Sequence, residues 1–307
     1  MKNNKQARAR LLLLVASFIW GTAFVAQRSG AANLGTFTFV FMRCLLAVVT
    51  LIPIMIINDK SKGKKVSLLG TSDKREIKIM IIGGLLSGLA WGIAAVFQQF
   101  GMVTTSASKA GFITSMYIVF VPVFALFLGK KTGLNVWVSV ILAVVGLYFM
   151  SVKDNFALNQ GDLLITVSAV FYAVQILITD HYANKIETVR FSLIQFAAVG
   201  IICGILAFVF EQPRIEGIMQ NWLALVYVGV LSSGVAFTLQ ISAQKEINPQ
   251  VASVIMCFEA VFALLGGVLL LNETLSAREI AGCVVVFAAL VLSQISFKKN
   301  KKDQITQ

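Results

Sequence analysis

Charged residues are scarce in this sequence, because aspartate, glutamate, lysine and arginine together make up 13% of its 307 residues. Soluble domains carry about 25% charged residues. Hydrophobic residues account for 58% of the chain, and the mean hydropathy is +0.84. This composition excludes a soluble globular protein and predicts an integral membrane protein whose first partner is the lipid bilayer.

The residues that usually perform enzymatic chemistry are equally scarce. Histidine occurs once, as His181 beside Asp180, and we interpret it as an interfacial polar residue. The sequence contains no glycine-rich phosphate loop and no zinc-protease helix motif. Four cysteines lie inside apolar runs without paired spacing, which is typical of small buried residues and not of disulfides or metal ligands: Cys44, Cys203, Cys257 and Cys283. We therefore expect no enzyme, no metal and no cofactor.

The net charge of +12 could indicate a nucleic-acid partner, but the basic residues lie in loops and tails between apolar segments. Counting them on alternate sides of the predicted spans puts 20 on the side of the N-terminus, 5 on or near the other side, and Arg43 within a span. Short cytoplasmic loops carry an excess of lysine and arginine. We therefore predict that both termini are cytoplasmic, that the protein crosses the plasma or inner membrane many times, and that it binds no nucleic acid.

Ten apolar segments are long enough to cross a bilayer, whose ~30 Å hydrocarbon core takes about 20 helical residues. We predict membrane-spanning helices at 11–28, 36–57, 78–101, 105–129, 134–152, 161–180, 190–210, 221–244, 249–271 and 277–297. The first segment follows four basic residues and so resembles a cleaved signal peptide. That alternative is disfavoured, because Phe24 stands where a small residue is needed before cleavage and removal would leave nine spans.

The chain repeats one design after about 143 residues, in the stretches 104–131 and 248–274. Each stretch is a long apolar run, followed by a short polar break and another apolar run. We interpret the chain as two five-helix halves, residues 1–152 and 153–307. Because five crossings end on the opposite side of the membrane, the second half should be inverted relative to the first. The predicted fold is therefore all-α, with ten transmembrane helices in two inverted five-helix repeats.

Three ionisable residues fall within predicted spans: Arg43, Lys109 and Glu259. A charge near the bilayer centre costs about 2.5–3.5 kcal/mol on insertion scales, so each should face the bundle interior or a wet cavity. Glu259 lies ~15 Å past Pro249 and hence near the midplane, which makes it a candidate for proton coupling or for binding an amine. Arg43 and Lys109 lie within about two turns of the outer surface, so their long side chains can reach it. They are coupling candidates too, although structural pairing of Arg43 and interfacial anchoring of Lys109 are favoured.

Polar and aromatic residues share single faces of the first, third and sixth predicted helices, where they are spaced by three, four or seven positions. Any one of them could simply pack against a neighbour, but their recurrence in corresponding helices of both halves favours a shared cavity. We predict substrate-binding roles for Trp20, Gln27, Trp91, Gln98, Tyr172, Gln175 and Glu259.

These features resemble the drug/metabolite transporter superfamily, and within it the EamA family. The matching residues are Trp20-Gly21, Arg43, the TSASKA stretch at 105–110, and Asn272-Glu273 after the ninth helix. The resemblance covers about residues 11 to 296. It implies ten helices in inverted repeats, a central cavity lined by helices 1, 3, 4, 6, 8 and 9, and export or exchange of small metabolites such as amino acids. The chain departs from the family pattern at three positions. Tyr117 and Ala260 stand where proline is often found, and Lys130 stands where glutamate is often found. These departures weaken the assignment of a better-known relative's substrate to this chain.

We therefore expect a secondary transporter that exports or exchanges a small, partly apolar metabolite by alternating access between its halves. An uncoupled facilitator of the same fold is the alternative, in which Glu259 only binds the substrate. A membrane-embedded enzyme, scaffold or sensor is less favoured, because no catalytic constellation and no loop long enough for a soluble domain is present. The identity of the substrate, proton coupling and a homodimer are left open.

Overall fold

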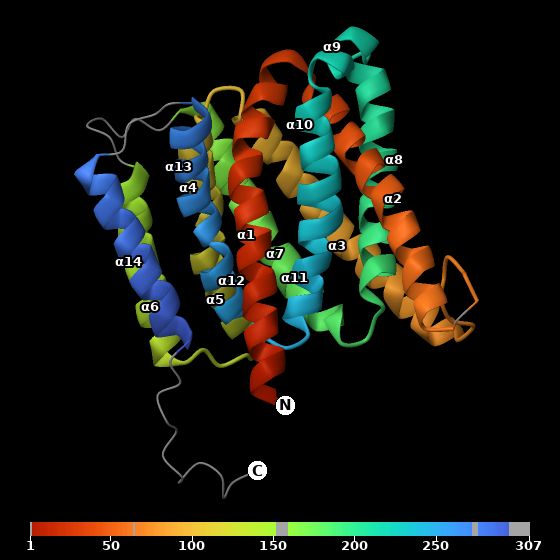
Figure 1. Cartoon of the computed structure of the whole chain (residues 1–307), viewed down its shortest axis with the longest axis horizontal. Coiled ribbons are helices and arrows are strands. Elements are labelled where there is room, and N and C mark those ends of the chain that lie inside the picture. Colours follow the sequence, from red (N-terminus) through yellow and green to blue (C-terminus); the bar gives the residue numbers. More distant parts are fainter. Residues whose placement is uncertain (1, 64, 152–158, 272–275, 295–307) are drawn as a thin grey trace, which may run out of the picture.

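The computed structural model describes residues 2–63, 65–151, 159–271 and 276–294, and these ranges contain helices and loops without β-strands (Figure 1). The first half holds α1 (Lys2–Asn33), α2 (Thr36–Ser61), α3 (Lys74–Gly101), α4 (Ala107–Ser115), α5 (Tyr117–Phe127) and α6 (Leu134–Ser151). The second half holds α7 (Gln160–Ala183), α8 (Thr188–Phe210), α9 (Ile215–Gln220), α10 (Trp222–Val226), the π-helix η1 (Tyr227–Ala236), α11 (Phe237–Gln244), α12 (Pro249–Met256), α13 (Phe258–Leu271) and α14 (Ala277–Gln294).

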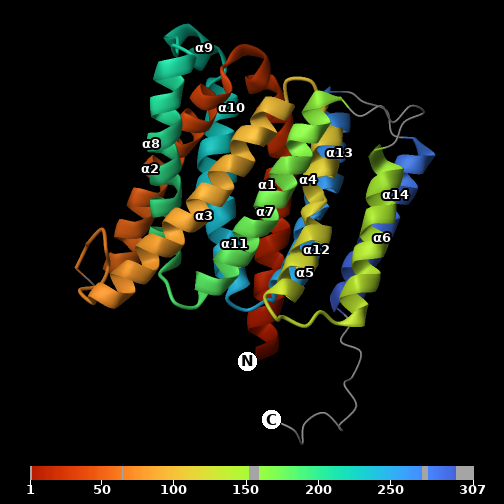
Figure 2. The same ribbon diagram turned by 180° about the vertical axis from the view of Figure 1, so that it is seen from behind.

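These helices form the ten membrane spans that the sequence predicts. Eight spans among the described residues are long and apolar enough to cross a bilayer, and three of them are composites: α4 with α5, α10 with η1 and α11, and α12 with α13. The apolar helices α6 and α14 are shorter and pack chiefly against each other at one side of the bundle (Figures 1 and 2). The short helix α9 was not predicted.

The two halves are inverted relative to each other, as predicted. α1 begins at the end of the bundle where the N-terminus lies, whereas α7, the first helix of the second half, begins at the opposite end (Figure 1). α14 ends on the same side as α1 begins (Figures 1 and 2). The face where α1 begins also carries the loops that follow α2, α5, α7 and α11 (Figure 2).

The fourth and ninth spans are interrupted, although the sequence predicts each as one continuous helix. The break falls at Met116 between α4 and α5, and at Cys257 between α12 and α13. Both residues have φ −62° and ψ −11°. At the first break the Met116 N–H bonds the Ile113 carbonyl at 3.1 Å, three residues back and not four. Hydropathy averaged over a span cannot register such a one-residue change.

The eighth span contains a second irregularity, because its middle ten residues form the π-helix η1. π-helical segments are rare and occur frequently at functional sites. Ser232 and Ser233, which give this apolar span a polar centre, lie in η1 and are both buried. The wider winding thus presents hydroxyl and carbonyl groups to the interior of the bundle.

Glycine allows the backbones of α1 and α13 to approach closely. A β-carbon added to Gly21 would lie 2.4 Å from Phe262 Cβ and 2.6 Å from the Glu259 carbonyl oxygen, where ordinary contact begins at 3.4 Å. Only glycine fits at such an approach. The Trp20-Gly21 pair therefore has a structural role, because the close approach at Gly21 brings Trp20 and Glu259 to the same part of the core.

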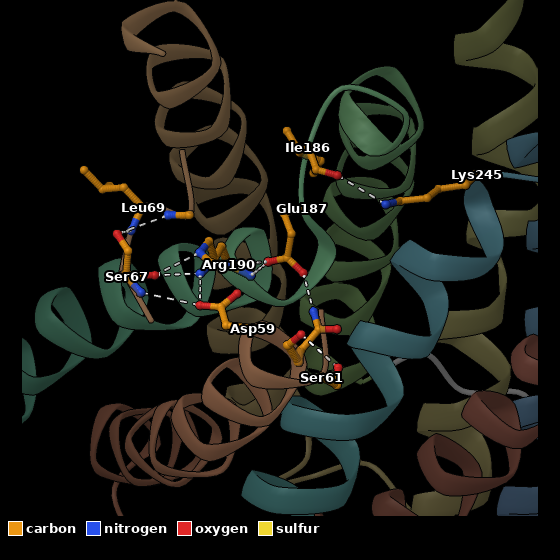
Figure 3. A network of polar contacts seen from close by, with 10 residues as sticks. Asp59, Ser61, Ser67, Leu69, Ile186, Glu187, Arg190 and Lys245 are labelled. Carbon is orange, nitrogen blue, oxygen red and sulfur yellow. Dashed lines mark hydrogen bonds and ion pairs between the residues drawn. The ribbon is translucent and has the colours of Figure 1, made fainter. Parts of the chain in front are cut away.

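A network of buried charges ties the loop after α2 to the start of α8 (Figure 3). The Arg190 guanidinium bonds Asp59 Oδ2 at 2.6 Å, the Ser67 carbonyl at 2.6 Å and Glu187 Oε2 at 3.1 Å. Arg190 and Asp59 are each 3% exposed. Because a buried ion pair is tolerated only with further hydrogen bonds, this network fixes the end of the bundle at which α1 begins.

Lys245 lies beyond the same end of α11 and faces the loop between α7 and α8 (Figure 3). Its ammonium donates a hydrogen bond to the Ile186 carbonyl at 3.2 Å. Burial lowers the pKa of Lys245 below its usual value, and the Glu187 carboxylate opposes that change. The lysine is therefore part of the packing at this end of the bundle.

Candidate functional site

A pocket lies at mid-depth between the two halves, and its cavity volume is about 40 Å³. It lies where helices from both repeats converge, as a site at a repeat interface should. The lining comes from the helices that the family resemblance implied, with the second helix in addition: Trp20, Phe24, Gln27, Arg43, Gln98, Thr114, Tyr117, Tyr172, Gln175, Ile176, Ser232, Phe237, Gln240, Met256 and Glu259.

Apolar side chains pack on either side of this pocket along the membrane normal. Toward the end where α1 begins, Leu13, Val121 and Ile255 belong to one buried cluster. Toward the opposite end, Met102 and Phe112 belong to another. The polar lining thus lies between two apolar clusters.

Arg43 lies in this pocket and not at the outer surface, although its place along the second span would let it reach that surface. The residue is 3% exposed. Its guanidinium donates to Ser233 Oγ at 2.9 Å, Gln27 Oε1 at 3.4 Å and Ser232 Oγ at 3.4 Å, and lies 5.0 Å from the centre of the Trp91 ring. The hydroxyls of η1 hold the charge inside, and counting residues along the second span does not show this contact.

Glu259 lies in the first turn of α13, directly after the helix break, and is 4% exposed. Ser115 Oγ, from the other broken span, donates to Glu259 Oε1 at 3.4 Å. The Tyr117 hydroxyl lies beside the same carboxyl. The two interruptions therefore meet around this one acidic side chain.

Trp20 and Trp91 have different positions, although the sequence predicts both on the cavity wall. Trp20 lines the pocket and donates its indole N–H to the Ser232 carbonyl at 3.0 Å. Trp91 is fully buried behind the lining, with ring centres 4.9 Å from Phe196 and 5.6 Å from Phe237. Trp91 supports Arg43 and Phe237 from behind, and the prediction that it lines the cavity was wrong.

Neutral polar groups connect the remaining lining residues. Gln98 Nε2 donates to Thr114 Oγ1 at 3.0 Å, and the Tyr172 hydroxyl donates to Gln98 Oε1 at 3.2 Å. Gln27 and Gln175 line the pocket as well. The structure thus brings together seven of the nine candidate residues, all except Trp91 and Lys109.

Lys109 lies outside the pocket, near the end at which α7 begins. Its ammonium bonds Asp162 Oδ2 at 2.6 Å, and Thr105 Oγ1 donates to Asp162 Oδ1 at 2.9 Å. Asp162 also forms a reciprocal capping box with Asn159 at the start of α7. This geometry agrees with an anchoring role for Lys109. The Asn-x-x-Asp spacing could have pointed to the cap.

Several lining residues were missed by sequence reasoning. Ser232 and Gln240 gave a signal, because they are polar residues inside the apolar stretch 221–244. Tyr117 and Met256 gave little signal in the sequence, because aromatic and sulfur side chains are common in buried helices. Their places depend on the helix breaks beside them.

Comparison with known proteins agrees with this arrangement. The family model described as "EamA-like transporter family" matches the chain twice, at residues 7–152 and 159–294. The chain belongs to the EamA-like transporter family. It is therefore a multi-pass membrane transporter, and each half carries one copy of the family unit.

Relatives of this EamA-like transporter cover nearly its whole length. It is 28% identical to an "Uncharacterized transporter" of Archaeoglobus fulgidus, over 94% of this chain and 86% of that protein. It is 24% identical to YoaV of Bacillus subtilis over 96% and 99%, and 22% identical to the inner membrane transporter YedA of Escherichia coli K12 over 92% and 89%. A solved structure described as "Crystal structure of protein" superposes with a TM-score of 0.73 at 18% identity, covering 93% of this chain and 96% of that one. At that identity the likeness shows the fold alone.

Proposed function

We propose that this transporter moves a small zwitterionic metabolite of the amino-acid type through the central pocket, by export or exchange. One observation carries the proposal: Arg43 and Glu259 line the same pocket, and their hydrogen bonds are to neutral groups. Neither side chain forms an ion pair with another described residue. A ligand that carries both an acidic and a basic group would complete both sites.

The cost of burying unpaired charges favours a charged ligand over a purely structural role for Arg43 and Glu259. A buried charge without an opposite charge is costly, and proteins usually pair it or bind it with hydrogen bonds. Arg43 has hydroxyl and amide partners, which leave the positive charge itself uncompensated. A substrate carboxylate at Arg43 and a substrate amine at Glu259 would each form a charge-assisted hydrogen bond.

The residues that line the pocket also limit the polarity of the ligand. The cavity volume of about 40 Å³ is below the roughly 300–1,000 Å³ of small-molecule sites, so the pocket must widen to take up a ligand. Phe24, Phe237 and Met256 supply apolar surface, whereas Trp20 and Tyr172 combine apolar rings with a polar end. These groups favour a ligand with a compact, partly apolar body between or beside its two charges.

Charge recognition is tested by comparing binding of an amino acid, its amide and its deaminated acid to purified protein. For alanine these are L-alanine, L-alaninamide, which lacks the carboxylate, and propionate, which lacks the amine, measured by thermal shift or calorimetry. Arg43→Gln should remove the preference for the carboxylate and leave that for the amine, while Glu259→Gln should do the reverse. Equal losses for all three ligands in both variants, or no preference in the wild type, would contradict the proposal.

The mode of transport depends on Glu259, the acidic side chain of the pocket. If Glu259 couples transport to protons, Glu259→Gln should still exchange substrate in proteoliposomes but should not respond to a pH gradient. If Glu259 only binds the substrate, the affinity should fall at every pH, as expected for an uncoupled facilitator. Normal transport with an unchanged pH response would exclude both roles.

We further propose that both termini face the cytoplasm and that the protein resides in the plasma or inner membrane. The excess of lysine and arginine on one side supports this orientation. α1 begins and α14 ends at the same end of the bundle (Figure 1). Ser61→Cys, at the end of α2, should be protected from an impermeant thiol reagent in intact cells. Glu216→Cys, on α9 at the opposite end, should react, and the reverse pattern would overturn the orientation.

A further inference from the structure

A chain of uncharged polar side chains leads from the wall of the pocket into the packed space between α3, α7 and α8. Gln240 Nε2 donates to Gln175 Oε1 at 3.4 Å, and Gln175 Nε2 donates to Thr179 Oγ1 at 3.0 Å. Thr179 Oγ1 lies 3.3 Å from Ser87 Oγ, which donates to Gln195 Oε1 at 2.8 Å. All five residues are buried, and Gln240 and Gln175 line the pocket.

All hydrogen bonds of this glutamine chain point the same way, from the pocket inward. Each amide nitrogen or hydroxyl donates to the next residue, so the two ends of the chain differ. At the pocket end, Gln240 Oε1 accepts no hydrogen bond from any described residue, and at the far end Gln195 Nε2 donates none. Gln240 is 1% exposed and Gln195 is fully buried.

An unpaired carbonyl oxygen at a buried site is costly, and most buried polar groups in proteins have a partner. Hydrogen bonds in a chain polarise one another, so a donor at one end strengthens the bonds behind it. Of the two unpaired atoms at the ends of this chain, Gln240 Oε1 belongs to a residue that lines the pocket and Gln195 Nε2 does not. The chain behind it holds the Gln240 amide in the orientation that keeps the nitrogen occupied and the oxygen available.

We propose that Gln240 Oε1 is a third subsite of the pocket, which accepts a hydrogen bond from a hydroxyl or amide N–H on the uncharged part of the substrate. The inference rests on the proposed function and deepens it. Arg43 and Glu259 bind the two charges, and Gln240 selects zwitterions whose side chain carries a hydrogen-bond donor. Ser87 and Gln195 are positioning residues, because they act through Gln175 and do not line the pocket.

The packing of α3 against α8 supports this positioning role. Gly88 follows Ser87, and a β-carbon on it would lie 2.9 Å from the Gln195 carbonyl oxygen. The two helices therefore approach closely at the far end of the chain. This contact holds Ser87 Oγ within reach of Gln195 Oε1 and so fixes the end of the chain opposite to the pocket.

The test compares the calorimetric binding of L-threonine and L-valine to purified wild-type protein. The two amino acids have nearly the same shape, and a hydroxyl in L-threonine replaces one methyl group of L-valine. We expect the wild type to bind L-threonine about tenfold more tightly, as for one well-placed hydrogen bond. Gln240→Leu should abolish this ratio, because it should weaken L-threonine binding more than L-valine binding. Ser87 does not contact the ligand, but Ser87→Ala should reduce the ratio because it breaks the glutamine chain. If Gln240→Leu does not fold, the result for Ser87→Ala tests the subsite.

Gln99→Leu is the matched control. Gln99 is a buried glutamine of α3 that also has one bonded and one unpaired amide atom, but it does not line the pocket. Its substitution should leave the L-threonine to L-valine ratio unchanged. Equal binding of both amino acids by the wild type, or an unchanged ratio in Gln240→Leu, would overturn the subsite and leave the zwitterion proposal intact. A wild type that binds neither amino acid would overturn both.

Discussion

Replacement of Gly21 by alanine tests how the approach of α1 and α13 builds the pocket. The new β-carbon would lie 2.4 Å from Phe262 Cβ, about 1 Å inside ordinary contact, and 2.6 Å from the Glu259 carbonyl oxygen. Backbone atoms of α13 cannot rotate away as a side chain could. α1 must therefore move back by about 1 Å, and overpacking of this kind typically costs about 1–3 kcal/mol.

Gly266→Ala provides a control on the same pair of helices. A β-carbon there would lie 3.5 Å from Val25 Cγ2 and 3.9 Å from Thr22 Cα, which is ordinary contact. Both substitutions gain the same helix propensity, up to about 1 kcal/mol. The difference between the two variants therefore isolates the collision at Gly21.

The assay is the midpoint of thermal unfolding in detergent, followed by ligand binding. We expect Gly21→Ala to melt roughly 2–10 °C below Gly266→Ala and to bind substrate more weakly, because Glu259 moves relative to Trp20. Gly266→Ala should melt at or slightly above the wild-type temperature. If the two variants melt together and bind equally, the close approach of α1 and α13 does not constrain the site.

The remaining predictions concern charge burial and the indole of the pocket wall. Arg190→Met should lower stability by about 3–5 kcal/mol, because it leaves Asp59 charged and buried. Lys130→Met breaks an ion pair whose lysine is 39% exposed and should cost less than about 1 kcal/mol, so similar melting of the two variants would refute the distinction. Trp20→Phe keeps the ring but loses the bond to the Ser232 carbonyl, and should weaken binding about fivefold without loss of the folded, monodisperse protein. Loss of folding without a separate binding defect would assign Trp20 to packing.

The span pattern was predictable because a bilayer imposes a length of about 20 apolar residues on each crossing. The repeat followed from similarity within the chain, and the odd number of crossings required its inversion. The depth of Glu259 followed from its distance to Pro249, since the helical rise is constant. These predictions depend on lengths and averages, which a single sequence contains.

The positions of individual side chains were less predictable, because they depend on how each helix is rotated and where it breaks. Arg43 was placed near the surface by counting residues, but the hydroxyls of η1 hold it inside. Trp91 shares the spacing of a lining residue, yet its ring faces Phe196 and Phe237. The breaks at Met116 and Cys257 carry no proline or glycine that could have marked them.

The central claim is that the pocket around Glu259 and Arg43 carries a zwitterion across the membrane. Counterflow of a radiolabelled amino acid into proteoliposomes, preloaded with the same unlabelled amino acid, measures this directly. L-threonine is the amino acid to use, because the proposed Gln240 subsite would bind its hydroxyl. We expect the wild type to accumulate label and Arg43→Gln, folded as judged by its melting temperature, to lose exchange by at least about tenfold, since a hydrogen bond to a charged group contributes about 1.5–3 kcal/mol. Wild-type rates in Arg43→Gln, or no accumulation of any amino acid by the wild type, would contradict the account.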